Sequence, residues 1–155
     1  MKKKLEFLVI HCTATPAGRE VSGADIRRWH TDPPPVGRGW KQVGYTRLYH
    51  INGGVEQLVP NNEDGYVDPW EITNGAEGHN AVCQHIVYAG GMDPSNTRPM
   101  DSRSLAQKES MRRDVLALHT RFPKVKIVGH NHFDSGKACP SFDVEGWLGT
   151  IGIKE

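Results

Sequence analysis

The sequence predicts an α/β fold, a single domain over residues 1–155 with a central mixed β-sheet flanked by helices. Short, dense apolar runs at residues 7–11 and 125–128 are typical of buried strands. Asn52-Gly53-Gly54 separates two segments of strand character and predicts a hairpin, hence an antiparallel pair. A long amphipathic segment precedes residues 125–128 and permits a parallel pair through a helical crossover. The length of 155 residues suits one domain with its own core.

Local signals predict the elements in the first half of the chain. Phe7 to His11 is an apolar run that ends at a polar residue, as a buried strand does. Ser22 is a suitable N-cap for a short helix, which must end before Pro33-Pro34-Pro35. The hairpin strands are expected at Tyr45 to Ile51 and Val55 to Val59, because Asn-Gly accepts positive φ in the tight turn.

Beyond the hairpin, residues 60–83 contain many turn formers and predict a long surface loop. A strand follows at His85 to Tyr88. Ser104 begins the longest helix, with Gln107 completing a capping box. The expected apolar face of that helix consists of Leu105, Met111, Val115, Leu118 and Phe122. Next come a strand at Val125 to Val128, an irregular loop at 130–141 and a short helix from Phe142 to about Leu148.

The composition excludes several classes of protein. Lys plus Arg number 19 and Asp plus Glu number 18, so overall charge does not indicate a nucleic acid or an anionic membrane as partner. No segment reaches the roughly 20 apolar residues of a membrane helix. After the basic start, the apolar run at residues 8–10 is too short for a signal peptide, and we expect none.

The three cysteines, Cys12, Cys83 and Cys139, are odd in number and far apart, which does not suggest a disulfide framework. A reducing compartment or a metal site is more natural. Cys12 and Cys83 are interpreted as buried thiols.

His11 and His130 each follow a predicted buried strand, where rigid backbone holds a side chain at the edge of the sheet. Cys139 lies nine positions after His130, in a loop that can return toward the strand. Two imidazoles and one thiolate with an open fourth position form a known kind of catalytic zinc site. The alternatives are hydrogen-bonded or exposed histidines and a small buried thiol.

Six segments, in order from residue 9 to residue 143, carry a resemblance to a known family. They are Val9-Ile10-His11-Cys12-Thr13-Ala14-Thr15, Ile26-Arg27-Arg28-Trp29-His30, Val43-Gly44-Tyr45, Gly90-Gly91, Val128-Gly129-His130 and Lys137-Ala138-Cys139-Pro140-Ser141-Phe142-Asp143. With these segments the chain resembles the zinc-dependent N-acetylmuramoyl-L-alanine amidases of the phage lysozyme type (amidase type 2). Their fold family also includes animal peptidoglycan recognition proteins.

The resemblance implies that His11, His130 and Cys139 bind Zn²⁺ and that Tyr45 and Lys137 are the catalytic pair. Zinc lowers the pKa of bound water to about 7, which suits attack on an amide carbonyl. Lys137 or the Tyr45 hydroxyl would stabilise the developing negative charge. Taken without the resemblance, Lys137 is a solvated loop charge and Tyr45 is an aromatic residue packed in the sheet.

The chain also departs from the family pattern. His132 follows His130 by two positions, so either histidine could be the ligand, and we choose His130 because it directly follows the strand and Gly129. Gly75 stands where family members often have a histidine, which concerns substrate contacts rather than zinc. Residues 33–39 and 61–72 are enlarged relative to the family; they could reshape the groove for a particular stem peptide, but we interpret them as ordinary surface insertions. Trp29 and His30 are assigned to packing, and His50, His79, His85 and His119 are not assigned to the metal.

The resemblance implies hydrolysis of the amide bond between N-acetylmuramic acid and L-alanine in peptidoglycan, as in a phage endolysin. The alternatives are a non-catalytic peptidoglycan-binding module and a cytoplasmic amidase that recycles wall fragments. We expect a monomer whose partner is peptidoglycan or a muropeptide, with no membrane or nucleic-acid partner. It would be cytoplasmic at synthesis and would act on the cell wall after release.

Overall fold

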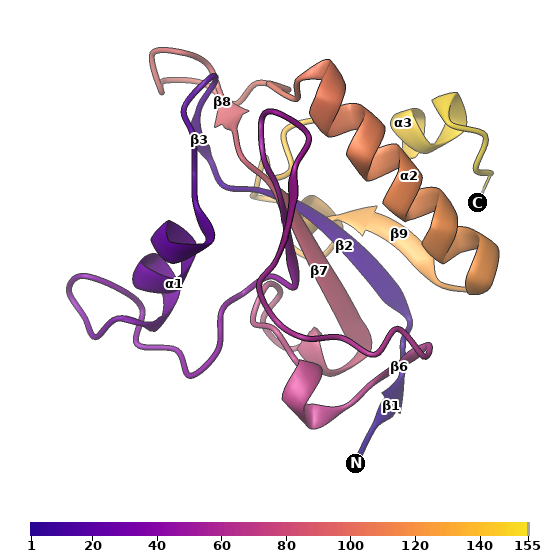
Figure 1. Cartoon of the computed structure of the whole chain (residues 1–155). Coiled ribbons are helices and arrows are strands. Elements are labelled where there is room, and N and C mark those ends of the chain that lie inside the picture. Colours follow the sequence, from indigo (N-terminus) through magenta and orange to yellow (C-terminus); the bar gives the residue numbers. More distant parts are fainter. Residues whose placement is uncertain (155) are drawn as a thin grey trace.

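The computed structural model describes residues 1–154 and has a five-stranded mixed sheet at its centre (Figure 1). The strand order is β5-β4-β7-β2-β9. The strands of this sheet are β2 (Phe7–Cys12), β4 (Arg47–Tyr49), β5 (Val55–Gln57), β7 (Cys83–Tyr88) and β9 (Lys126–Gly129). The helices are α1 (Gly23–Thr31), α2 (Leu105–Arg121) and α3 (Val144–Thr150). The predicted α/β fold with a mixed sheet is confirmed.

Both kinds of strand pairing occur as predicted. β4 and β5 are antiparallel around the Asn-Gly turn, where Gly53 has a φ of 88°. β2 is parallel to both of its neighbours, β7 and β9. The pairs Val9↔His85 and Val9↔Val128 fix the register of β7, β2 and β9.

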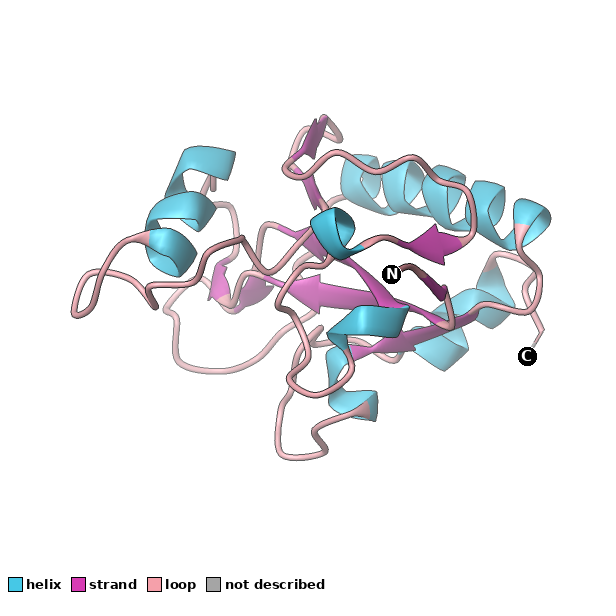
Figure 2. Ribbon diagram, turned by 90° about the horizontal axis from the view of Figure 1, so that it is seen from below, coloured by secondary structure: helices cyan, strands magenta, loops and turns pink. Residues whose placement is uncertain are grey.

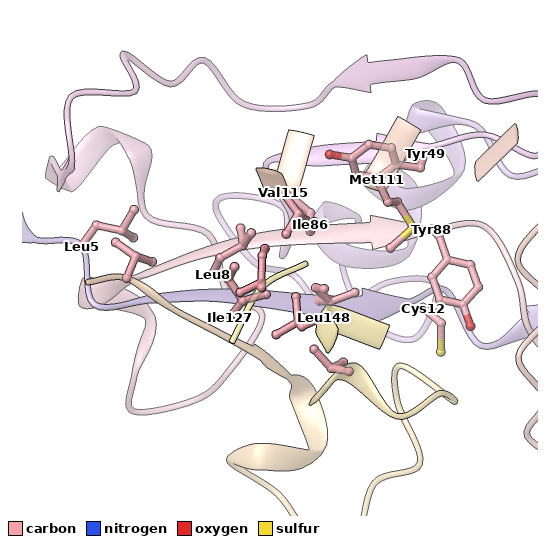
Figure 3. Packing of buried hydrophobic residues seen from close by; sticks show 14 of the residues in the cluster. Leu5, Leu8, Cys12, Tyr49, Ile86, Tyr88, Met111, Val115, Ile127 and Leu148 are labelled. Atoms are coloured by element: carbon pink, nitrogen blue, oxygen red, sulfur yellow. The ribbon is translucent and has the colours of Figure 1, made fainter. Parts of the chain in front are cut away.

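Alternation along β2 separates the two faces of the sheet. Leu8, Ile10 and Cys12 belong to a core cluster with residues of α2 and α3, including Met111, Val115 and Leu148 (Figure 3). Figure 2 shows α2 lying along one side of the sheet. Val9 and His11 therefore point to the opposite face.

The opposite face carries a second core cluster beneath α1. Ile26 of α1 packs in it with Leu48 of β4 and Val87 of β7. Ser22 caps α1 as predicted, because its hydroxyl accepts a hydrogen bond from the Asp25 N–H at 3.0 Å. His11 thus lies on the face of the sheet that α1 covers in part.

The predicted loop at residues 60–83 contains more regular structure than expected. The short strand β6 (Tyr66–Val67) pairs with β1 (Lys3–Lys4) near the N-terminus. Two 3₁₀ turns lie at Pro69–Glu71 and Asn80–Val82. Another unpredicted pair joins β3 (Thr15–Pro16) to β8 (Gly91–Met92). Two-residue strands carry too little periodicity to be recognised from sequence.

The long helix α2 begins after Ser104 with the predicted capping box. Met111 and Val115 are buried, and Leu118 and Phe122 pack partly buried against the same core. Leu105 was wrongly placed on this face, because its side chain is 85% exposed. At this end of α2 the inward position belongs to Gln107, whose amide donates to the backbone carbonyls of Tyr49 at the end of β4 and of Ala89 just after β7.

No helix among residues 1–154 is long and apolar enough to span a membrane.

Candidate metal centre and adjoining groove

Parallel pairing brings His11 and His130 together at one edge of the sheet. His11 lies near the end of β2, and His130 directly follows Gly129 at the end of the neighbouring strand β9. The carboxyl ends of adjacent parallel strands meet at the same edge. The centroids of the two imidazole rings are accordingly 4.7 Å apart.

Cys139 reaches the same place because the loop after β9 folds back. Asn131 N–H donates to the Cys139 carbonyl at 3.0 Å, and the Tyr88 hydroxyl donates to the Pro140 carbonyl at 2.6 Å. The Cys139 Sγ then lies 3.3 Å from the Cys12 backbone nitrogen and 3.8 Å from His11 Nδ1. The loop is therefore tied to β2, β7 and its own beginning.

One ligand atom from each of His11, His130 and Cys139 lies within 4.8 Å of the others, so the three could hold a metal ion. Two imidazole nitrogens and a thiolate sulfur are ligands that zinc prefers. His132 takes no part in this group. Its ring lies against the rings of Phe7 and Phe133, at centroid distances of 5.9 and 4.9 Å.

Burial keeps the imidazoles of His11 and His130 neutral, and the neutral ring is the form that binds a metal ion. Burial, with the neighbouring His85 and His130, lowers the pKa of His11 well below its usual value. Burial and the positive charge of Lys137 lower the pKa of His130. Both rings are therefore neutral at neutral pH, with a lone pair available for a cation.

The thiol of Cys139 differs from a free surface cysteine. A hydrogen bond with the Cys12 thiol, together with burial, raises the pKa of Cys139. In the metal-free protein this thiol is protonated at neutral pH, and a bound cation would have to displace its proton.

Tyr45 stands beside the three residues, just before β4. Its ring centroid is 5.0 Å from that of His11 and 5.2 Å from that of His30. Burial raises the pKa of Tyr45, so its hydroxyl remains a hydrogen-bond donor. The preceding residue, Gly44, donates its N–H to His30 Nδ1 at 2.9 Å, which holds the segment against α1.

Lys137 lies on the exposed part of the loop that carries Cys139. It lines a groove of about 450 Å³ together with Tyr45, His130 and Arg38. The five sequence-predicted site residues thus lie in one region, with His130, Tyr45 and Lys137 lining the groove and with His11 and Cys139 next to His130. Their functional roles stay a prediction.

Sequence reasoning missed His85, which contacts this group through His11, and Asn80, which contacts His85 in turn. His85 Nδ1 lies 2.8 Å from His11 Nε2, and His85 Nε2 lies 3.0 Å from Asn80 Oδ1. His85 is fully buried on β7, on the same face as His11. Period-two alternation could have placed His85 on this face, but only once the register between β2 and β7 was known.

Cys12 and Cys83 are buried free thiols, as predicted. His30, assigned to packing, does pack against the Trp40 and Tyr45 rings but also lines the groove.

No family model matches the chain. The chain is 29% identical over 141 residues to the endolysin of Enterobacteria phage K11, an alignment covering 91% of this chain and 83% of that protein. It is 28% identical over 146 residues to the endolysin of Klebsiella phage KP32, covering 94% and 87%.

Solved structures share the fold. The Ph2119 endolysin from the Thermus scotoductus MAT2119 bacteriophage superposes with a TM-score of 0.71 at 24% identity, covering 98% of this chain and 87% of that chain. The N-acetylmuramoyl-L-alanine amidase LysC from Clostridium intestinale URNW gives 0.72 at 18% identity, covering 97% and 87%. Drosophila PGRP-LB gives 0.63 at 15%, covering 90% and 79%. These three likenesses show that the chain shares its fold with an endolysin, an amidase and a PGRP of known structure.

Proposed function

We propose that this chain is a zinc-dependent amidase that hydrolyses the bond between N-acetylmuramic acid and L-alanine in peptidoglycan, and that it acts as a phage endolysin. The observation that carries the proposal is the convergence of His11, His130 and Cys139 beside a groove that also contains Tyr45 and Lys137. The endolysin relatives support the substrate class.

His11, His130 and Cys139 would hold the zinc, since their donor set suits that ion and their ligand atoms are close together. When bound, zinc supplies Lewis acidity and makes water a nucleophile at neutral pH. The chain's own contribution begins with keeping both imidazoles neutral through burial.

Lys137 and Tyr45 would stabilise the charge that develops on the amide carbonyl oxygen. The Lys137 ammonium at the rim of the groove supplies a positive charge, and the protonated Tyr45 hydroxyl supplies a hydrogen bond. Losing one such donor typically lowers kcat by about 10²–10³-fold. The segment that carries Tyr45 is held to the sheet, because the Thr46 N–H donates to the His85 carbonyl at 2.8 Å, so the Tyr45 hydroxyl needs little reorganisation during the reaction.

We further propose that the substrate is peptidoglycan or a muropeptide and that the protein works as a monomer. Synthesis in the cytoplasm followed by release onto the cell wall would match the endolysin relatives.

The test combines metal content with the chemistry of the cut. The unaltered protein should contain about one zinc per chain and release stem peptides from purified peptidoglycan. Amide cleavage exposes a new amino group on L-alanine, whereas glycosidic cleavage would expose a new reducing sugar. Measuring both ends by mass spectrometry identifies the bond.

Three variants sharpen this test. Cys139→Ala should lose both zinc and peptide release, while Cys83→Ala, which removes a buried thiol from the start of β7, should keep both. Lys137→Met should keep zinc and lose about 10²-fold or more in kcat. A protein that binds wall material but holds no zinc and releases no peptide would be a recognition module instead.

A further inference from the structure

His11 belongs to a line of hydrogen-bonding groups that runs away from the candidate metal ligands. Its Nε2 lies 2.8 Å from Nδ1 of His85 on β7. Nε2 of His85 lies 3.0 Å from Oδ1 of Asn80, in the 3₁₀ turn before that strand. The other nitrogen of His11, Nδ1, faces the Cys139 sulfur at 3.8 Å.

The donor and the acceptor of each hydrogen bond in this line can be assigned by starting at Asn80, the residue farthest from the candidate metal ligands. The backbone N–H of Ala76 donates to Asn80 Oδ1 at 2.8 Å, so the atom at that position must be the amide oxygen. An oxygen there can only accept, and His85 therefore carries a proton on Nε2. His85 and His11 are 0% and 1% exposed, and burial keeps both rings neutral.

A neutral imidazole has one N–H and one lone pair. Because His85 uses its proton toward Asn80, its Nδ1 is an acceptor, and His11 must donate from Nε2. The lone pair of His11 is then on Nδ1, on the side of Cys139. If both rings instead carried their proton on Nδ1, His85 Nε2 and Asn80 Oδ1 would be two acceptors facing each other.

We propose that His85 and Asn80 are positioning residues that hold His11 in the tautomer with its proton on Nε2, so that Nδ1 is ready to bind the metal. This inference rests on the proposed function for the identity of the metal. It assigns a role to a histidine that the motifs leave aside.

The packing around His85 supports this role. The segment at Gly75 passes so close that a Cβ there would lie 2.6 Å from both Cγ and Nδ1 of the His85 ring. The Thr46 N–H donates to the His85 carbonyl at 2.8 Å, which fixes the backbone of the residue.

The tautomer of His11 can be read directly by NMR in the metal-free protein. Two-bond ¹H–¹⁵N correlations of the imidazole distinguish a protonated from an unprotonated nitrogen. We expect His11 to show a protonated Nε2 and a bare Nδ1, and His85 to show the same. A proton on Nδ1 of His11 in the unaltered protein would overturn the proposal.

Variants of His85 then test whether this residue determines the tautomer of His11. His85→Leu removes the acceptor and should give His11 a mixed or reversed tautomer, with zinc affinity about 10–100-fold weaker in competition with a chelator. His85→Asn can place an amide oxygen near the position of Nδ1 and should restore the tautomer and most of the affinity. His79→Ala is the matched control, because His79 is an exposed histidine next to Asn80 that stacks on Phe133 at 4.3 Å.

The outcomes separate this inference from the proposed function. If the unaltered protein binds no zinc and cuts no peptidoglycan, the proposed function fails, whereas the tautomer is still measured without metal. If zinc binds normally while His85→Leu changes neither the His11 tautomer nor the zinc affinity beyond twofold, the positioning role is wrong. Should His85→Leu not fold, His85→Asn and the unaltered protein still decide the question.

Discussion

His11 contacts other groups through both of its ring nitrogens, and each contact comes from a different part of the chain. Nε2 meets His85 of β7, and Nδ1 faces Cys139 of the loop after β9. A histidine held on both sides loses little freedom when it binds a metal. Groups that hydrogen-bond to the second nitrogen of a ligating histidine usually fix its tautomer and the orientation of its ring.

The contact between His85 and His11 also requires that residue 75 have no side chain. Gly75→Ala would place a Cβ 2.6 Å from the His85 ring and 2.9 Å from the Gly44 carbonyl oxygen. The backbone atom cannot move easily, so we expect about 1–3 kcal/mol of destabilisation and weaker zinc binding. Urea unfolding and chelator competition measure the two effects.

Gly149→Ala serves as its control, because a Cβ at Gly149 in α3 meets nothing within 4 Å. Helix propensity should stabilise that variant by about 0.5–1 kcal/mol. Equal effects of the two substitutions would contradict the role given to Gly75.

At the scale of elements, the caps of α1 and α2 were recognised in sequence, but their partners in the fold differ. Ser22 accepts one hydrogen bond, from Asp25 N–H. Ser104 accepts from Gln107 N–H at 3.0 Å and also donates to the Ile51 carbonyl at 2.6 Å, thereby joining α2 to the end of the hairpin.

This difference predicts unequal effects of removing the two caps. Ser104→Ala should lower the free energy of unfolding by about 1–2 kcal/mol, since it loses the cap and leaves the Ile51 carbonyl without this donor. Ser22→Ala should cost about 0.5–1 kcal/mol. Thermal or urea unfolding of both variants checks the order, and a larger loss for Ser22→Ala would show it to be wrong.

At the scale of the whole molecule, several neutral histidines are buried together, which makes stability depend on pH. Burial and Arg38 lower the pKa of His30 to about 4, and burial and His130 lower that of His85 to about 3. An unfolded histidine has a pKa near 6.5. Between about pH 6.5 and 4 the unfolded chain therefore binds protons that the folded protein does not.

Consequently, the metal-free protein should lose stability as the pH falls through this window and regain it as the pH rises. Each histidine contributes at most about 1.4 kcal/mol per pH unit. Urea unfolding at pH 7, 6 and 5 measures the slope. The slope should be shallower for His85→Asn, and a free energy of unfolding independent of pH would contradict the account.

The sequence by itself determined much of this protein. Strand and helix periods, the Asn-Gly turn, the caps at Ser22 and Ser104 and the positions of His11 and His130 after buried strands are all local signals. Local backbone geometry and burial on one face impose these patterns within a few residues. The α/β class and most elements of the sheet could therefore be predicted.

Only the tertiary structure decided which side chains meet. His130 rather than His132 faces His11 because the chain turns after Gly129 and sends His132 against Phe7. His85 reaches His11 because β7 pairs with β2 in one particular register. Leu105 is exposed because Gln107 takes the inward position at that end of α2. Strand register and the return of a loop depend on contacts between distant segments, which no local periodicity records.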